Sequence, residues 1–269
     1  MQVIYKTSEQ IALIRVSSLL VGDTLAEVGA AIKPGIKTIE LDKIAETFIR
    51  DNKAVPAFKG YHGFPASLCI SVNSEVVHGI PGKRELKEGD VVSIDCGVIK
   101  DNFFGDSAYT FTIGEVSEKV RKLIQVTKES LYLGIDKAVA GFRIGDISAA
   151  VQDHAESNGF GVVRELVGHG VGVKLHEKPE VPNYGKRGSG MVLKTGMVIA
   201  IEPMINAGKR GVIQLDDGWT IVTADRLPSA HFEHTVAIGI TKADVLSSFE
   251  KIELSENQNI NLSKQESVT

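Results

Sequence analysis

The sequence has few cysteines and no long apolar run. Its two cysteines, Cys69 and Cys96, each lie in an apolar stretch of the 269-residue chain. Cysteines so few and so placed predict reduced core thiols in a cytoplasmic protein, not a disulfide framework. No stretch approaches the ~18 apolar residues of a membrane-spanning helix, and the first residues lack the apolar segment of a signal peptide. We therefore expect a cytoplasmic protein with no membrane partner.

An excess of basic charge is also missing. The 30 Lys and Arg residues stand against 34 Asp and Glu residues, which gives a net charge of −4. Nucleic acid is therefore not expected as a substrate, because binding to phosphates needs a basic surface. Apolar residues make up 43% and charged residues 24% of the chain, an ordinary globular balance. A chain of this length can bury a substantial core without disulfides.

Apolar residues spaced three and four apart predict two helices near the start of the chain. The first has its apolar face from Ile11 to Ile32 and ends before Pro34-Gly35. The second has its apolar face over residues 41–49. Segments rich in β-branched and aromatic residues follow and favour strands. The strands expected there are 66–73, 90–98 and 103–111.

The same order of elements returns in the second half of the chain. We expect Ser117 and Asp146 to cap two further helices, because both residue types accept hydrogen bonds from the first turn of a helix. Strands are expected near 197–201 and 231–238. The chain thus repeats the order of helix, helix and strands.

The repetition extends to individual residues. The GDVVSID run at 89–95 aligns with GMVIAIE at 196–202, and Ser8-Glu9 aligns with Ser117-Glu118 at nearly the same offset. Two such matches indicate an internal duplication and a single α+β domain. We expect this domain over residues 1–254, with halves of about 1–112 and 113–254. The polar residues 255–269 are expected to form a disordered tail.

Two acidic residues of the first half are expected to face each other. A hairpin centred on Lys100-Asp101 would place Asp95 directly opposite Asp106. Directly opposed side chains on neighbouring strands lie about 5 Å apart at Cβ. Two carboxylates inside apolar strands repel each other, so either one is protonated or a cation lies between them.

The second half predicts the same arrangement. A longer hairpin centred on Asp217-Gly218, a strong two-residue turn signal, would place Glu202 opposite Glu233. Each copy of the duplicated unit thus presents a pair of opposed acids inside apolar strands. Because buried charges are normally paired or bound to a metal, the four carboxylates predict a cation site.

One histidine joins these acids as a candidate metal ligand. His169 lies in the GHGVG run at 168–172, whose glycines allow other groups to approach the ring closely. The glycine spacing does not match a dinucleotide-binding loop, and His176-Glu177 lacks the second histidine of a zincin helix. A set of four carboxylates and one histidine favours Mn²⁺, Fe²⁺, Co²⁺ or Zn²⁺ and leaves room for two ions.

These motifs together resemble the type I methionine aminopeptidases. The motifs are SIDCG at 93–97, GDSA at 105–108, GHGVG at 168–172, HE at 176–177, IEP at 201–203 and FEHT at 232–235. The resemblance runs from about residue 5 to residue 250 and is specific, because five ligand positions occur in order with the expected neighbours. It implies the pita-bread fold, in which two pseudo-symmetric α–β halves share a central antiparallel sheet and hold the metal site between them.

The resemblance implies two divalent ions (Co, Mn, Fe or Zn) and a role for each ligand. Asp95 would bind one ion through both oxygens. Asp106 and Glu233 would bridge the two ions. His169 and Glu202 would complete the coordination of the second ion.

The resemblance also assigns a substrate site. Glu202 would transfer protons, and His78 and His176 would contact the substrate and stabilise the transition state. The apolar methionine pocket would be lined by Tyr61, Phe64, Cys69 and Trp219. A nearby monovalent-cation site would involve Asn73, Glu75 and Ser229.

The implied activity is removal of the N-terminal methionine from nascent proteins and peptides. A small second residue would be preferred, and a metal-activated hydroxide would attack the peptide carbonyl. The expected partners are therefore the N-termini of peptides and nascent chains. We expect a monomer, and a transient contact with the ribosome is left open.

Two residues depart from the family pattern and leave the exact shape of the pocket open. Phe58 occupies a position that is often small or Cys in bacterial relatives, and Leu175 stands where Phe is usual. The alternative enzymes are a prolidase or aminopeptidase P, which usually carry an extra N-terminal domain, and a type II enzyme. The short stretch between His169 and Glu202 has no room for a large helical insertion, which favours type I. The alternative of a different class is a non-catalytic protein that binds nascent chains or partners.

Overall fold

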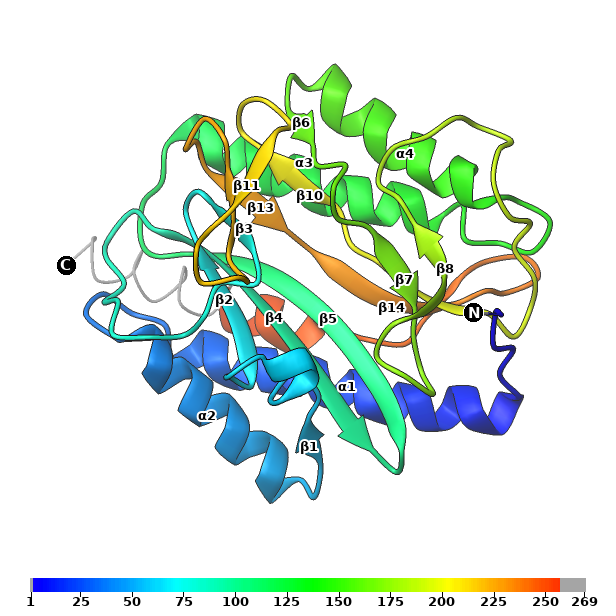
Figure 1. Cartoon of the computed structure of the whole chain (residues 1–269), viewed down its shortest axis with the longest axis horizontal. Helices are drawn as coiled ribbons and strands as arrows, with labels where there is room; N and C mark the ends of the chain where they lie inside the picture. Colours follow the sequence, from blue (N-terminus) through cyan, green and yellow to red (C-terminus); the bar gives the residue numbers. More distant parts are fainter. Residues whose placement is uncertain (1, 257–269) are drawn as a thin grey trace.

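A twisted antiparallel sheet of nine strands organises the structure (Figure 1). The computed structural model describes residues 2–256. Seven strands follow one another in the order β1-β4-β5-β14-β9-β7-β8, while β2 pairs with β4 and β15 pairs with β14. Their bounds are β1 Val55–Pro56, β2 Leu68–Val72, β4 Val91–Lys100, β5 Phe103–Thr112, β7 Gly168–Gly170, β8 Glu177–Val181, β9 Val198–Ile201, β14 Glu233–Ala237 and β15 Asp244–Val245.

Two small three-stranded sheets stand beside the large one. One has the order β13-β10-β6 and the other β11-β12-β3. Their bounds are β3 Glu75–Val77, β6 Gly161–Val162, β10 Met204–Asn206, β11 Val212–Gln214, β12 Ile221–Thr223 and β13 Ser229–His231. The second of these sheets pairs β3 of the first half with β12 of the second half, so it ties the two halves of the chain together.

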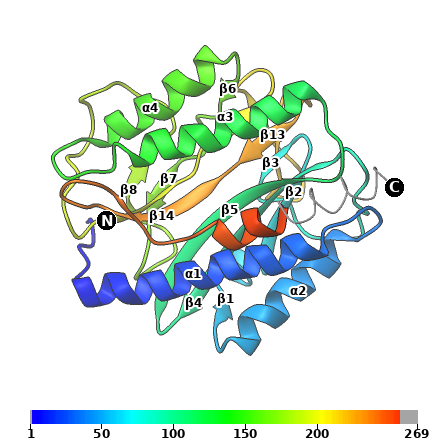
Figure 2. The same cartoon turned by 180° about the vertical axis from the view of Figure 1, so that it is seen from behind.

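The helices cover one face of the large sheet and lie in front of it in Figure 2. The four long helices within residues 2–256 are α1 (Ser8–Ala31), α2 (Thr38–Asp51), α3 (Glu118–Ile135) and α4 (Ile144–Ser157). Helix α1 begins with a capping box, in which Thr7 and Gln10 each accept from the other's backbone N–H. Among the described residues, no helix has the length and apolar character to cross a membrane.

Ser117 caps α3 as predicted, since its hydroxyl accepts from the N–H of Val120. The prediction that Asp146 caps α4 is wrong, because the helix begins at Ile144 after Arg143. Asp146 is the third residue of the helix, and its carboxylate accepts from the N–H of Arg143 at 2.8 Å. An acid in the first turn stabilises a helix start almost as well as a cap does, and the sequence pattern does not separate the two.

The two halves of the chain meet where β5 pairs with β14. Glu233 lies opposite Ala108, and His234 lies opposite Ser107. Strands β1, β2, β4 and β5 of the first half lie on one side of this seam, and β7, β8 and β9 lie on the other. The predicted α+β architecture with two halves and a central antiparallel sheet is therefore confirmed. The boundary between the halves near residue 112 stays a prediction.

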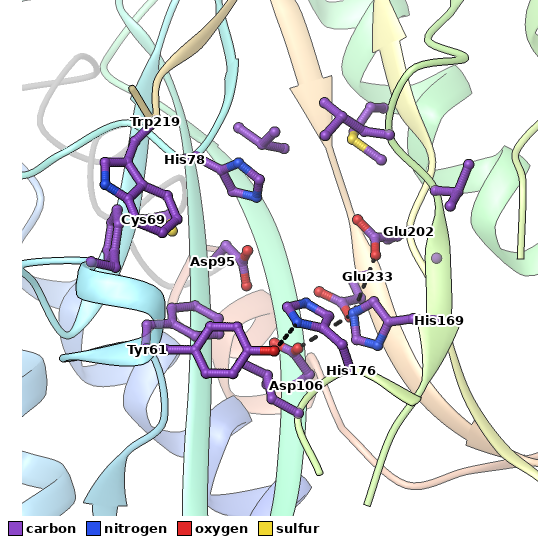
Figure 3. Close-up of a pocket in the computed structure, with 18 of the residues that line it drawn as sticks. Tyr61, Cys69, His78, Asp95, Asp106, His169, His176, Glu202, Trp219 and Glu233 are labelled. Atoms are coloured by element: carbon purple, nitrogen blue, oxygen red, sulfur yellow. Dashed lines mark hydrogen bonds and ion pairs between the residues drawn. The ribbon is translucent and has the colours of Figure 1, made fainter. Parts of the chain in front are cut away.

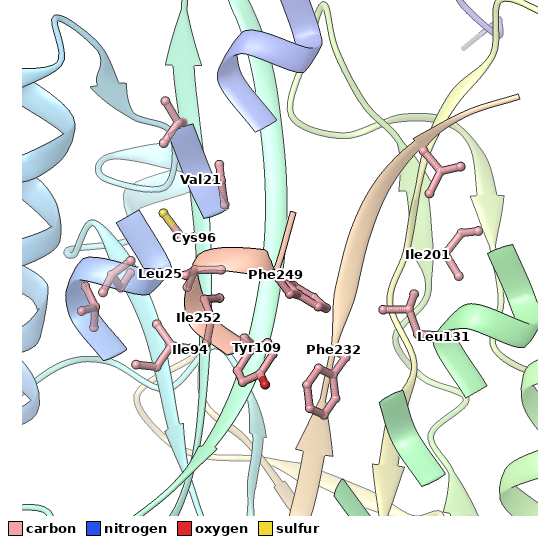
Figure 4. Packing of buried hydrophobic residues seen from close by; sticks show 14 of the residues in the cluster. Val21, Leu25, Ile94, Cys96, Tyr109, Leu131, Ile201, Phe232, Phe249 and Ile252 are labelled. Carbon is pink, nitrogen blue, oxygen red and sulfur yellow. The ribbon is translucent and has the colours of Figure 1, made fainter. Parts of the chain in front are cut away.

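The main hydrophobic core lies between the sheet and the helices (Figure 4). Its central side chains include Val21 and Leu25 of α1, Ile94 of β4 and Phe232, all within 1% of full burial. Each such side chain contributes roughly 1.5–3 kcal/mol by leaving water. Cys96 lies in this core and Cys69 lies in another buried cluster, and both are free thiols. The predicted reduced core cysteines are thus confirmed.

The end of the described chain differs from the prediction of a tail from residue 255. Residues 250–256 are helical, and Ile252 of this segment is buried in the main core. The Tyr109 hydroxyl donates to Glu256 at 2.8 Å. A partner from β5 thus orders a polar segment that composition alone assigns to a tail. The rest of the predicted tail, 257–269, lies outside the described residues.

Candidate metal centre and substrate pocket

The first predicted pair of acids shares one face of the β4–β5 hairpin. Asp106 lies opposite Gly97 and Asp95 lies opposite Ala108, so the predicted direct opposition of the two acids is wrong by two residues. The turn residues are Asp101 and Asn102, both at positive φ (51° and 65°), as a type I′ hairpin turn requires. Because the error is an even number of residues, both side chains still point to the same side of the sheet.

The second predicted register is confirmed. Ile201 pairs with His234, Met204 pairs with His231 and Gln214 pairs with Ile221, all in the register centred on Asp217-Gly218. The hairpin is broken into three short ladders. Glu202 follows the last residue of β9, and Glu233 is the first residue of β14. The two acids therefore meet at a break between ladders, where their side chains are free to turn toward the first pair.

All five candidate metal ligands line one cavity of about 380 Å³ (Figure 3). They come from both sides of the seam, with two from the first half and three from the second. The first-half ligands are Asp95 and Asp106, and the second-half ligands are His169, Glu202 and Glu233. The cavity therefore lies between the two halves, as the resemblance implies.

The ligand atoms are close enough to share cations. One atom each from Asp106, His169 and Glu233 lies within 4.8 Å of the other two. His169 Nε2 lies 3.5 Å from Glu202 Oε1 and 3.8 Å from Asp106 Oδ2. The other ring nitrogen, Nδ1, lies 3.0 Å from the carbonyl oxygen of Gly170. A proton on Nδ1 would donate there, which leaves Nε2 with a lone pair directed at the carboxylates.

Several oxygens of this cluster are buried and lack a hydrogen-bond donor among the described residues. They are Asp95 Oδ1, Asp106 Oδ1 and Glu233 Oε1. Buried acceptors without a partner are costly and rare. Hard oxygen donors beside one imidazole suit divalent ions such as Mn²⁺, Fe²⁺, Co²⁺ and Zn²⁺. The donor set therefore fits a metal.

The protein alone cannot hold four ionised carboxylates in this cavity. Burial raises the pKa of Asp95 to about 7 and the pKa of Glu202 to about 8. Burial, and then the neighbouring carboxylates, hold the pKa of Asp106 and of Glu233 well above the usual range. Burial lowers the pKa of His169 to about 3, so this ring is neutral at pH 7. Cations in the cavity would remove the repulsion and let the acids ionise.

The cavity also gathers all six predicted substrate residues. They are Tyr61, Phe64, Cys69, His78, His176 and Trp219. The apolar end is formed partly by Phe64 and Trp219. Their rings pack edge to face, with centroids 5.1 Å apart. Phe58 and Leu175, the two departures from the family pattern, are buried in the same cluster. Both side chains line the cavity.

The two histidines predicted to contact the substrate are neutral at pH 7. Burial lowers the pKa of His78 and of His176 to about 4. The Tyr61 hydroxyl lies 2.8 Å from His176 Nδ1. If Tyr61 donates this bond, the ring proton of His176 is on Nε2, where it can be donated into the cavity. Tyr61 is thus more than a wall of the apolar pocket, a role that the sequence does not indicate.

The residues predicted for a monovalent cation lie apart from this cavity. Asn73 donates to Asp90 and accepts from the N–H of Val91. The Ser229 hydroxyl donates to the carbonyl of Ile205 at 3.1 Å, and Arg84 binds Glu75. Asn73 and Ser229 do meet through their backbones, since the N–H of Ser229 donates to the carbonyl of Asn73 at 2.9 Å. Their side chains are already engaged, so the cation site stays a prediction.

His231 is a neighbour of this cluster that the sequence motifs do not indicate. It is 1% exposed, and its Nε2 lies 3.6 Å from Glu202 Oε2 without a hydrogen-bond partner in residues 2–256. Glu202 therefore stands between two imidazoles, His169 at one oxygen and His231 at the other. The available signal was position, because His231 precedes Glu233 by two residues and so shares its face of an extended strand.

Buried acids from two halves, one neutral imidazole and an adjoining apolar pocket define a metal-dependent hydrolase. Comparison with known proteins supports this class. The sequence model of metallopeptidase family M24 matches residues 12–239. The chain belongs to metallopeptidase family M24.

Similar proteins and solved structures are methionine aminopeptidases. The methionine aminopeptidase of Clostridium perfringens is 55% identical over 236 residues, which cover 88% of this chain and 95% of the relative. Methionine aminopeptidase 1 of Bacillus subtilis is 51% identical over 245 residues, covering 91% and 99%. The crystal structure of the Thermotoga maritima methionine aminopeptidase superposes with a TM-score of 0.90 at 42% identity, covering 92% and 100%.

Proposed function

We propose that this chain removes the N-terminal methionine from peptides and nascent proteins. The observation that carries the proposal is the cavity in which a complete set of five candidate metal ligands adjoins an apolar pocket. Relatives more than half identical over nearly their whole length are methionine aminopeptidases. These relatives favour this activity over that of a prolidase or aminopeptidase P. A complete ligand set also disfavours a protein that only binds its partners.

Two divalent ions (Co, Mn, Fe or Zn) would be held by Asp95, Asp106, His169, Glu202 and Glu233. When bound, they would supply a water activated for attack on the peptide carbonyl. The bridging role proposed for Asp106 and Glu233 is supported by their proximity to each other and to His169. We also propose a monovalent-cation site near Asn73, Glu75 and Ser229, where the N–H of Ser229 donates to the carbonyl of Asn73.

Glu202 would carry the proton from the attacking water to the leaving amine. Its Oε1 faces His169 and its Oε2 faces His231, so the carboxylate is held between two rings. A carboxylate at the cavity wall can accept a proton at one oxygen while the other keeps its contact. The proton then leaves with the amine of the second residue, and Glu202 returns to its ionised form.

His176 and His78 would act on the substrate. His176, with Nδ1 next to the Tyr61 hydroxyl, would donate from Nε2 to the carbonyl oxygen as negative charge develops there. His78 also lines the cavity, with its ring centroid 6.5 Å from that of Trp219. From this place it would contact the substrate next to the apolar end.

The apolar end would receive the methionine side chain. Phe64, Cys69 and Trp219, together with Phe58 and Leu175, form a pocket suited to an unbranched, polarisable thioether. A free α-amine, with a reference pKa of about 7.7–8.0, can be neutral and reach the acids at the far end. Cleavage would thus be confined to the first residue, with a small second residue preferred.

We further propose a cytoplasmic monomer that meets nascent-chain N-termini, with contact to the ribosome left open. The thiols of Cys69 and Cys96 are free, which accords with a reducing compartment.

The test is release of methionine from Met-Ala-Ser by protein supplied with Mn²⁺. Glu202→Ala is expected to lower kcat by at least about 100-fold, because the proton carrier is lost. The matched control is Asp153→Asn, at an exposed acid paired with Arg187 on the surface, and it should retain wild-type activity. Preferred cleavage of an Xaa-Pro peptide would favour the prolidase alternative. Bound metal without any cleavage, or full activity of Glu202→Ala, would contradict the proposal.

A further inference from the structure

The segment that carries His176 has little regular structure of its own. Residues 172–176 form a series of bends between β7 and β8. The ring of His176 nevertheless enters the cavity beside His169, with ring centroids 4.3 Å apart. Something outside the segment must therefore fix its path.

Glu177, the first residue of β8, ties this segment together. Its Oε1 accepts from the N–H of Val173 at 2.7 Å and from the N–H of Lys174 at 2.8 Å. The side chain thus binds the backbone three and four residues earlier and closes the segment into a loop. Its other oxygen, Oε2, lies 2.5 Å from Nζ of Lys6.

Lys6 comes from the N-terminal segment and is separately anchored. Its backbone N–H donates to the carbonyl of Gly196 at 2.7 Å. The side chains of Lys6 and Glu177 are each 1% exposed, so this ion pair is fully buried. A Cβ on Gly172 would come within 3.1 Å of Lys6 Cε, so the loop rests directly on the Lys6 stem. A pair buried this deeply is not screened by solvent, and loss of one partner leaves an uncompensated charge.

We propose that Lys6 is a positioning residue for His176. Through Glu177 it fixes the loop of residues 172–176, so that the imidazole meets Tyr61 and the substrate carbonyl. The cationic partner matters because the same carboxylate must hold two backbone N–H groups while it is buried. This inference rests on the proposed function, since it concerns the placing of a residue that acts on the substrate.

The test is a double-mutant cycle on Met-Ala-Ser cleavage with equal metal content in all variants. Lys6→Met is expected to lower kcat by about tenfold, because a displaced catalytic group loses its alignment, while KM changes little. In a His176→Ala background the same substitution should cost less than about twofold, because no ring remains to be positioned. Lys251→Met, which breaks a surface pair with Asp23, is the matched control and should leave kcat unchanged.

Two further measurements separate positioning from stability. Amide exchange of Val173 and Lys174 should accelerate in Lys6→Met, while exchange in β7 stays as in the wild type. Lys6→Met/Glu177→Gln removes both charges and should recover part of the lost kcat, because a glutamine oxygen can still accept from the loop. If Lys6→Met alone does not fold, this double variant replaces it in the cycle, with a kcat expected below wild type.

Equal losses of kcat in both backgrounds, or a lower Tm with unchanged kcat, would overturn the positioning role. Wild-type protein that releases no methionine would instead contradict the proposed function. The two failures are therefore distinguishable within one experiment.

Discussion

Burial decides the chemistry of single residues in the candidate metal centre. Asp106 and Glu233 are at most 3% exposed, so ionisation without a counter-charge would be costly. The neighbouring histidines are neutral for the same reason, because burial lowers the pKa of His169 to about 3. Metals bind neutral imidazoles and ionised carboxylates. A bound cation would therefore find the ring in the right form and would offset the cost of ionising the acids.

The hydroxyl of Tyr61 is expected to matter for turnover. Tyr61→Phe removes the group 2.8 Å from His176 Nδ1 but keeps the ring that lines the pocket. The loss of about 1 kcal/mol of hydrogen bonding corresponds to roughly a fivefold lower kcat, with KM for Met-Ala-Ser nearly unchanged. Steady-state kinetics measures both, with Tyr5→Phe at an exposed tyrosine as control. A raised KM at constant kcat would show that Tyr61 acts on substrate binding alone.

The sequence alone predicts which residues share the cavity better than it predicts the individual contacts between their side chains. The candidate metal ligands and the predicted pocket residues all line one cavity, as the resemblance of their motifs to a known family indicates. His231 and the Tyr61–His176 contact were not predicted. Both depend on distances between segments far apart in the chain, which residue type and spacing do not encode.

The backbones of α1 and β5 approach each other closely beside the candidate metal centre. Gly105 precedes Asp106, and a Cβ there would lie 2.4 Å from the backbone nitrogen of Ser18 in α1. Helix α1 therefore packs directly on β5 at the position next to a candidate metal ligand. Only glycine fits at this crossing, which also explains how the helix and the strand pack without a gap.

Gly105→Ala is expected to destabilise the protein by about 3 kcal/mol, since overpacking a tight contact forces the backbones apart. Urea denaturation of the metal-free protein measures the change in the free energy of unfolding. Gly82→Ala is the matched control, because the nearest atom to a Cβ there is 3.9 Å away. Equal stability of the two variants would show that α1 does not depend on this contact.

Elements were predicted well and their connections less well. Helices α1 and α2 follow from apolar periodicity, and the hairpin around Asp217-Gly218 follows from its turn residues. The register of β4 and β5 was wrong by two residues, because Asp101-Asn102 takes the turn instead of Lys100-Asp101. Several polar residues in a row can each form a turn, and packing of the strands selects one of them.

At the scale of the whole molecule, the repulsion between buried carboxylates is concentrated at the seam between the two halves. Four acids, located in or beside β4, β5, β9 and β14, surround one cavity, and strand pairing at the seam holds them there. The folded protein therefore contributes a constraint that the unfolded chain lacks. Metal binding and folding are coupled through this constraint.

The stability of the metal-free protein is expected to fall as pH rises from about 7 to 8. Glu202 has a folded pKa of about 8 and ionises near pH 4 when unfolded. Below pH 8 the folded state therefore binds more protons than the unfolded state. For each such proton, the free energy of unfolding falls by roughly 1 kcal/mol for every unit by which the pH rises. Buried histidines oppose this trend little, because above their unfolded pKa of about 6.5 they are mostly neutral in both states.

Thermal unfolding across this pH range checks the prediction. The Tm of metal-free protein should decrease with pH, and saturating Mn²⁺ should abolish the decrease because the bound acids are already ionised. A Tm of the metal-free protein that rises over the same range would contradict the assignment of protonated acids to the cavity.

The most direct test of the central claim is a titration of metal-stripped protein with Mn²⁺, in which bound metal and methionine release from Met-Ala-Ser are measured together. In the wild type, release should begin from near zero and rise with occupancy. Asp106→Asn should bind Mn²⁺ more weakly by at least about tenfold and release methionine far more slowly, while Asp153→Asn follows the wild type. Full release without metal, or wild-type Mn²⁺ binding by Asp106→Asn, would contradict the claim that these acids hold the catalytic ions.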